Sequence, residues 1–207
     1  RIITSFGDVA GFSHPHTYSR LANGHVLTTF QYRADANTAK EMRGHASGMA
    51  SMNNSQPNVT GGLVEMDERG HPIMSASAVD PSIRDHFIYP YSVLPIPSID
   101  RAVSTTTDMN LGDTVATSQW VQIWRLSDLK LLRTIALPPG SGAHTKANEF
   151  SGEPRLLADG RSVYIHTFNC GLYLLRDVSH STPVATLVHT FDGTECGVPI
   201  LTSHYWI

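Results

Sequence analysis

The chain has 207 residues, a net charge of −3 and a composition that is 41% hydrophobic and 16% charged. The scarcity of charge argues against a coiled coil or a disordered linker protein. Without a basic surplus to neutralise phosphates, the sequence predicts no nucleic-acid partner. The uninterrupted apolar runs span only a few residues, which predicts no membrane-spanning helix.

Short β-type runs alternate with turns that contain Gly, Pro or Asp, and this pattern is typical of an all-β fold. Three hairpins of one kind lie at 20–30, 97–107 and 156–166, and a second hairpin follows each of them, at 62–75, 121–135 and 172–185. Asn23-Gly24 and Asp159-Gly160 are strong hairpin-turn pairs. The strands predicted from alternation are 24–31, 62–67, 72–78, 101–107, 120–126, 131–137, 162–168, 171–176 and 184–190.

Each pair of hairpins makes a four-stranded antiparallel unit, and such units repeated along a chain are typical of β-propeller blades. The blades are expected near 12–80, 88–137 and 152–191, with the start of another at 197–207. We therefore interpret residues 1–207 as part of a single β-propeller domain, with a β-sandwich as the alternative. Since a propeller ring needs about four to eight blades, the remaining blades are expected in missing chain segments or in a partner. The chain starts at Arg1 without an initiator Met, which is consistent with a missing upstream piece.

Strand order within a blade decides which loops share a face. The tight hairpin turns lie on one face, and the longer connections lie on the other; these are 31–60, 78–92, 108–119, 138–151 and 192–197. Long loops on a rigid scaffold usually carry function, so we expect the site on the long-loop face.

Eleven histidines are an unusual number for a chain of this length and favour metal binding or proton chemistry. His14 and His16 are two positions apart before the innermost strand of their blade, so on an extended segment they share a side and suit a metal. His144, in a long loop of the same face, is the third predicted metal ligand. Hydrogen-bonded or exposed loop histidines are the plainer alternative. His16 is predicted to be the most function-sensitive histidine.

A second group of residues is expected on the long-loop face, at the mouth of the propeller's central channel: His86, Glu153 and Arg155. They are candidates to contact a small ligand, whereas a structural salt bridge is the alternative for Glu153 and Arg155. His166 and His189 lie inside predicted strands, where packing or solvation explains them.

Cys170 and Cys196 are the two cysteines of the chain. They are predicted to remain unbridged, because loops of adjacent blades seldom bring two Cα atoms within the roughly 7 Å that a disulfide needs.

Several segments of the chain resemble the selenium-binding protein family, whose bacterial members include the copper-containing methanethiol oxidases. The resemblance covers about residues 12–176 and depends on Pro15-His16-Thr17, 61–67, 120–125 and Glu153-x-Arg155 in this order. It implies a seven-bladed propeller longer than this chain, copper as a cofactor, and a periplasmic or extracytoplasmic location, with the cytoplasm as the alternative. A second histidine of the family's pattern falls on Ser19 here.

Three functions are compatible with these observations. The first is a divergent propeller of this family that binds a metal ion or small ligand at the long-loop face of its channel. The second is a copper-dependent oxidase of small thiols, of the methanethiol oxidase type. The third is a non-catalytic scaffold for protein interactions, because a fold does not fix a function.

Overall fold

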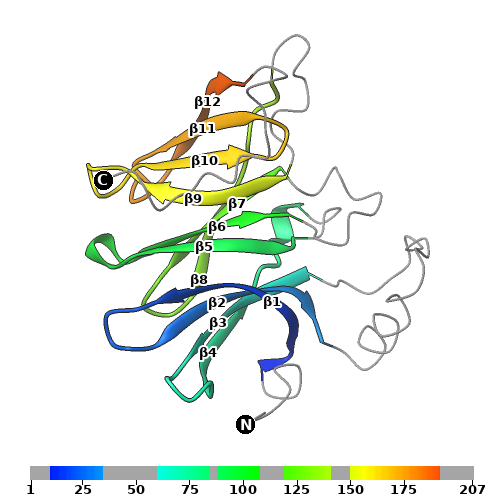
Figure 1. Ribbon diagram of the computed structural model, residues 1–207, viewed down its shortest axis with the longest axis vertical. Coiled ribbons are helices and arrows are strands. Elements are labelled where there is room, and N and C mark those ends of the chain that lie inside the picture. The colour runs from blue at the N-terminus through cyan, green and yellow to red at the C-terminus, as the bar shows by residue number, and fades with distance from the viewer. Residues whose placement is uncertain (1–9, 35–59, 84–87, 108–118, 141–149, 192–207) are drawn as a thin grey trace, which may run out of the picture.

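The computed structural model describes residues 10–34, 60–83, 88–107, 119–140 and 150–191. These residues form three four-stranded antiparallel sheets with almost no helix (Figure 1). The first sheet contains β1 (Phe12–Arg20), β2 (Val26–Arg33), β3 (Thr60–Met66) and β4 (Pro72–Ser77). The second contains β5 (Pro90–Ile96), β6 (Arg101–Thr106), β7 (Trp120–Arg125) and β8 (Lys130–Ala136). The third contains β9 (Ser151–Leu156), β10 (Val163–Thr167), β11 (Gly171–Arg176) and β12 (Val184–Thr190).

The strands of each sheet pair in the order in which they occur along the chain. All nine predicted strands are confirmed within a few residues. The first strand of each sheet has no counterpart among those nine ranges, and each of these strands contains proline: Pro15 in β1, Pro90 and Pro95 in β5, and Pro154 in β9. Proline lacks an N–H for the ladder and is confined to sheet edges, which is where β1, β5 and β9 lie.

The three sheets lie side by side, and their first strands are close to one another: β5 contacts both β1 and β9. Alternate residues of the second sheet face the two neighbouring sheets. Ala102 and Trp124 pack with Leu27 and Leu63 of the first sheet. The next residues along these strands, among them Val103, pack in a separate cluster with residues of the third sheet. The apolar layers between the sheets thus follow from the two-residue period of a strand.

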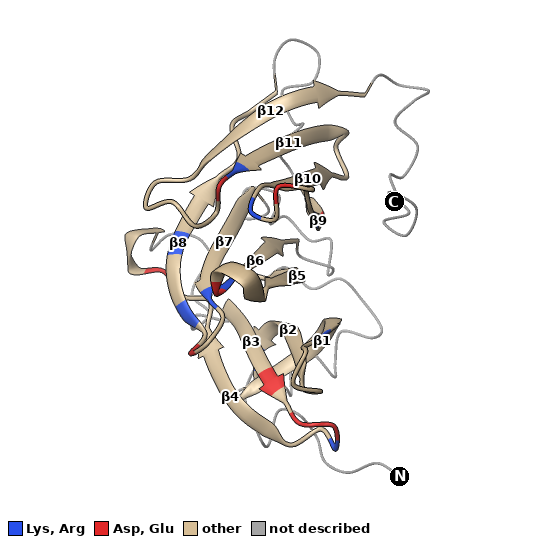
Figure 2. Cartoon of the chain, turned by 90° about the vertical axis from the view of Figure 1, so that its left-hand side faces the viewer, with Lys and Arg blue, Asp and Glu red and all other residues tan. Residues whose placement is uncertain are grey.

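Tight turns join the strands within each hairpin and lie together on the left of Figure 1, as predicted. Gly24, Gly70 and Gly160 have φ values of 88°, 83° and 72°, in the left-handed region that glycine adopts without a Cβ clash. Asp100 joins two turns of the second sheet, because its carboxylate accepts hydrogen bonds from the backbone N–H (2.8 Å) and hydroxyl (2.9 Å) of Ser127. Figure 2 shows that most of the strand surface carries no charged residue.

The prediction that Cys170 is a free thiol is wrong. Cys170 is disulfide-bonded, and no described cysteine is free. The chain's one other cysteine, Cys196, lies outside the described residues. Cys170 ends the β10–β11 turn, where its carbonyl accepts a hydrogen bond from Phe191 N–H at 2.9 Å. The chain therefore passes beside Cys170 shortly before it reaches Cys196 in the sequence.

No helix among the described residues is long and apolar enough to cross a bilayer.

Polar side chains also connect the sheets. Gln31 donates from its amide to the carbonyl of Thr107 at 2.7 Å, and Gln122 donates to the carbonyl of Ala78 at 2.8 Å. Between the second and third sheets, Ser151 Oγ accepts the N–H of Thr106 and donates to the Thr106 carbonyl, both at 2.9 Å. Each of these three side chains is buried, so each bond forms where water cannot replace it.

We predict that Ser151→Ala lowers the free energy of unfolding by about 1–3 kcal/mol, because it leaves the buried N–H of Thr106 without its partner. Denaturant unfolding followed by fluorescence measures this difference. Ser181→Ala, at an exposed position of the third sheet's last turn, is the control and is expected to change little. Equal stabilities of the two variants would contradict the prediction.

Candidate functional site

His14 and His16 lie within β1, whereas the sequence placed them before the innermost strand. The β1–β2 register shifts between Pro15 and Tyr18, and His14 has a positive φ of 58°. The two imidazoles contact different neighbours. The ring of His14 packs edge-on against Tyr32 of β2, with centroids 5.1 Å apart, and the ring of His16 lies 4.0 Å from that of Tyr91 on β5.

His16 is held by a hydrogen bond to the neighbouring sheet: its Nδ1 lies 2.9 Å from the carbonyl oxygen of Tyr91. A carbonyl only accepts, so Nδ1 carries the hydrogen and Nε2 carries the lone pair of the neutral ring. Burial lowers the pKa of His16, although the Tyr91 carbonyl and the negative charge of Glu153 act in the opposite direction. At neutral pH the ring is therefore uncharged, with Nε2 able to accept a hydrogen bond or to bind a metal.

The carbonyl of Tyr91 is a junction between the first two sheets. Besides His16, it accepts hydrogen bonds from the hydroxyls of Thr17 (3.0 Å) and Thr29 (2.9 Å). One hydrogen bond recurs in both sheets: Thr17 N–H donates to Thr29 Oγ1 in the first, and Ser92 N–H donates to Thr105 Oγ1 in the second. His16 and Tyr91, each one residue earlier, therefore occupy equivalent positions on their edge strands.

Glu153 and Arg155 lie on β9, the edge strand of the third sheet, and form an ion pair. The sequence left a salt bridge and a ligand contact open; the structure contains the salt bridge. The carboxylate of Glu153 also acts on the other two sheets. Its charge opposes the decrease that burial causes in the pKa of His16, and it adds to the increase that burial causes in the pKa of Tyr91. The Glu153 carboxylate thus interacts with a side chain on the first strand of every sheet: His16 on β1, Tyr91 on β5 and Arg155 on β9.

His166 on β10 is a further candidate that sequence reasoning assigned to packing. Its side chain is only 4% exposed, and its ring packs edge-on against Phe168. Burial lowers its pKa from 6.5 to about 4, with Arg155 adding to the decrease and Glu153 opposing it. A Cβ on Gly152 would lie 2.2 Å from His166 Nε2, so only a glycine leaves room for this ring. Its position next to Gly152 depends on strand pairing, which the residue pattern around His166 did not reveal.

The remaining predicted site residues, His86 and His144, lie outside the described residues. Within the described part of the chain, no group of three His, Cys, Asp or Glu side chains could hold a metal ion. His14 and His16 therefore have no third ligand there, and the predicted role of His144 stays a prediction.

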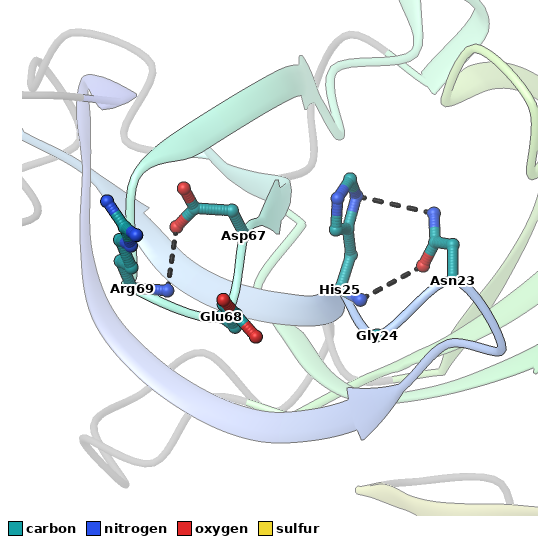
Figure 3. Close-up of a pocket in the computed structure, with 6 residues that line it drawn as sticks. All are labelled: Asn23, Gly24, His25, Asp67, Glu68 and Arg69. Atoms are coloured by element: carbon teal, nitrogen blue, oxygen red, sulfur yellow. Dashed lines mark hydrogen bonds between the residues drawn. The ribbon is translucent and has the colours of Figure 1, made fainter.

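A hollow of about 330 Å³ lies on the tight-turn side of the first sheet (Figure 3). It is lined by Asn23, Gly24, His25, Asp67, Glu68 and Arg69. Its side chains largely bond to their own neighbours: His25 Nδ1 lies 2.6 Å from the buried carboxylate of Glu65, and Asp67 lies 3.1 Å from His71. The hollow is thus on the side of the sheet opposite the start of β1, away from the predicted site.

No protein-family model matches the sequence, and no curated protein matches it either. Among solved structures, a hypothetical selenium-binding protein from Sulfolobus tokodaii is similar, with a TM-score of 0.56 over 89% of this chain. The sequence identity is 14%, so the likeness is one of fold. The chain spans 37% of that protein's length.

We predict that His166 makes the protein less stable as the pH falls from about 6.5 to about 4. In this range the unfolded chain binds a proton at this residue and the folded chain does not, so stability present above pH 6.5 is lost as the pH decreases. The full loss from this group is roughly 3 kcal/mol. Urea unfolding at several pH values is expected to give a shallower decline for His166→Gln than for wild type.

The same measurement on His189→Gln, which removes an exposed histidine of the same sheet, provides the control. An unchanged pH dependence in His166→Gln would show that His166 is not buried in its neutral form.

Proposed function

We propose that the chain is part of a β-propeller similar to selenium-binding proteins and that it binds a metal ion or small ligand at the edge strands β1, β5 and β9. Three observations support the propeller. The sheets are four-stranded, their strands follow chain order, and their first strands contact one another. The fold likeness to a protein named as a hypothetical selenium-binding protein supports the same architecture. The remaining sheets would come from segments beyond this chain or from a partner.

The observation that carries the binding proposal is the hydrogen bond between His16 Nδ1 and the Tyr91 carbonyl, 2.9 Å long. Histidines that bind metals almost always donate their other ring N–H to a carbonyl or carboxylate, which fixes the tautomer and the orientation of the ring. Because burial keeps the ring neutral, metal binding at Nε2 does not first require loss of a proton at neutral pH.

The donor set suits a metal that accepts imidazole, and copper and zinc both do so. We infer that His16 is a ligand and that His14 and His144 supply the others, with copper as the candidate metal. The metal would supply a Lewis-acidic or redox centre. The chain's own contribution is to hold the His16 ring between Tyr91 and Thr17, whose hydroxyl lies 3.2 Å from Nδ1.

The test is the metal content of the purified protein. It is measured by inductively coupled plasma mass spectrometry after equilibration with copper or zinc and removal of free metal. His16→Gln removes one of the three proposed ligands and is expected to lower metal occupancy by about tenfold or more. Losing only a residue that supports a ligand already lowers metal affinity by about tenfold or more.

His71→Gln is the matched control, because His71 is exposed on the tight-turn side. His25 is a poorer control, since its loss would leave the buried carboxylate of Glu65 without its partner. Equal occupancy in wild type, His16→Gln and His71→Gln would refute the role of His16. Absence of metal from all three would favour an interaction scaffold.

A further inference from the structure

Two buried polar atoms of the third sheet have no hydrogen-bond partner among the described residues: Arg155 Nε and His166 Nδ1. The rest of the Arg155 guanidinium is bonded, through Nη1 to the Pro154 carbonyl and through Nη2 to Glu153. Buried polar atoms without a partner are rare in folded proteins, because burial removes their hydrogen bonds to water and nothing replaces them. Two such atoms in one place call for a group that satisfies both.

The strand register brings these two side chains together. Arg155 pairs with Tyr164 across the β9–β10 ladder, and His166 follows Tyr164 by two positions on β10. Residues directly opposite share a face, as do residues two apart on one strand, so Arg155 and His166 are diagonal neighbours on one face. Diagonal neighbours have Cβ atoms somewhat less than about 7–8 Å apart, a gap that one small group between the side chains can bridge.

The ring orientation of His166 leaves Nδ1 as the open atom. Nε2 points at the backbone of Gly152, and the backbone of Glu153 accepts a hydrogen bond from the ring. The bonded nitrogen is therefore Nε2, and Nδ1 of the neutral ring has a lone pair that accepts. Arg155 Nε can only donate. The two open atoms thus require a ligand group that both accepts and donates.

Charge selects the class of that group. The guanidinium of Arg155 is already paired with the carboxylate of Glu153. An added anion would lie close to that carboxylate without a free cation to compensate it. A neutral hydroxyl avoids this repulsion and has both an acceptor and a donor.

We propose that Arg155 and His166 form a binding site for a hydroxyl group of a small neutral molecule. The hydroxyl oxygen accepts from Arg155 Nε, and its hydrogen is donated to His166 Nδ1. Neither residue belongs to the proposed metal ligands, so this site, which specifies the small ligand that the proposed function allows at β9, is tested separately from metal binding at His16.

The test uses nuclear magnetic resonance of the histidine side-chain nitrogens in the ¹⁵N-labelled chain, with ethylene glycol as the neutral probe and formate as the anionic one. Ethylene glycol is expected to shift the His166 Nδ1 resonance to saturation, and formate is expected to leave it unchanged. Arg155→Lys keeps the charge but removes the Nε donor, and should weaken the apparent affinity for the glycol by roughly tenfold, as expected for a hydrogen bond to a charged group.

Arg176→Lys is the matched control, because it makes the same substitution at an exposed position of the same sheet and should bind the glycol like wild type. A response to formate in place of the glycol would overturn the neutral ligand. A response to neither probe would overturn the site, and equal glycol affinity in wild type and Arg155→Lys would exclude Arg155 from it. None of these results depends on metal content, so failure here and failure of the metal proposal can be told apart.

Discussion

Hydrogen bonds from the side chains of one sheet to the backbone of the next hold the edge strands in place, and the candidate site depends on them. An edge strand has backbone groups that no ladder satisfies. In β5, the carbonyl of Tyr91 accepts from Thr17 and Thr29, and the carbonyl of Val93 accepts from Ser19 at 2.8 Å. Each bond contributes only about 0.5–1.5 kcal/mol, but together they fix the spacing between the sheets. His16 joins the same carbonyl, so the contact that connects two sheets also orients the candidate ligand.

Burial and charge compete at the histidines near these strands, and burial has the larger effect. Glu153 raises the pKa of both His16 and His166, yet desolvation is the first cause in each case and both pKa values are lowered. At His166, the upward effect of Glu153 on the pKa is partly cancelled by Arg155, its ion-pair partner, whose positive charge lowers the same pKa. Imidazoles kept neutral in this way can bind a metal or accept a hydrogen bond at neutral pH, which a charged imidazolium cannot do.

The sequence predicted local features well and contacts between distant residues poorly. Runs of β-type residues between turn signals located nine strands, whereas the first strand of each sheet is interrupted by proline and was not located. His16 was chosen as a candidate because it lies in a recognisable segment, and its role stays a prediction. The pairing of His166 with Gly152 and Arg155 comes from the register of β9 with β10, which no local pattern contains. The disulfide at Cys170 was missed for the same reason, since it depends on where β12 ends.

The three sheets repeat one framework and differ where His166 lies. The ladder between the first and second strands shifts register once in each sheet, and the second-strand residue at the shift is Thr29 in the first sheet, Thr105 in the second and His166 in the third. A threonine fits this position in the first two sheets, where its hydroxyl accepts a backbone N–H of the edge strand, at 3.0 Å from Thr17 and at 3.3 Å from Ser92. An imidazole fits only because Gly152 has no Cβ. A larger, titratable group that requires a glycine beside it and has a ring nitrogen without a partner is costly for packing alone, and the proposed hydroxyl site would give that nitrogen a partner.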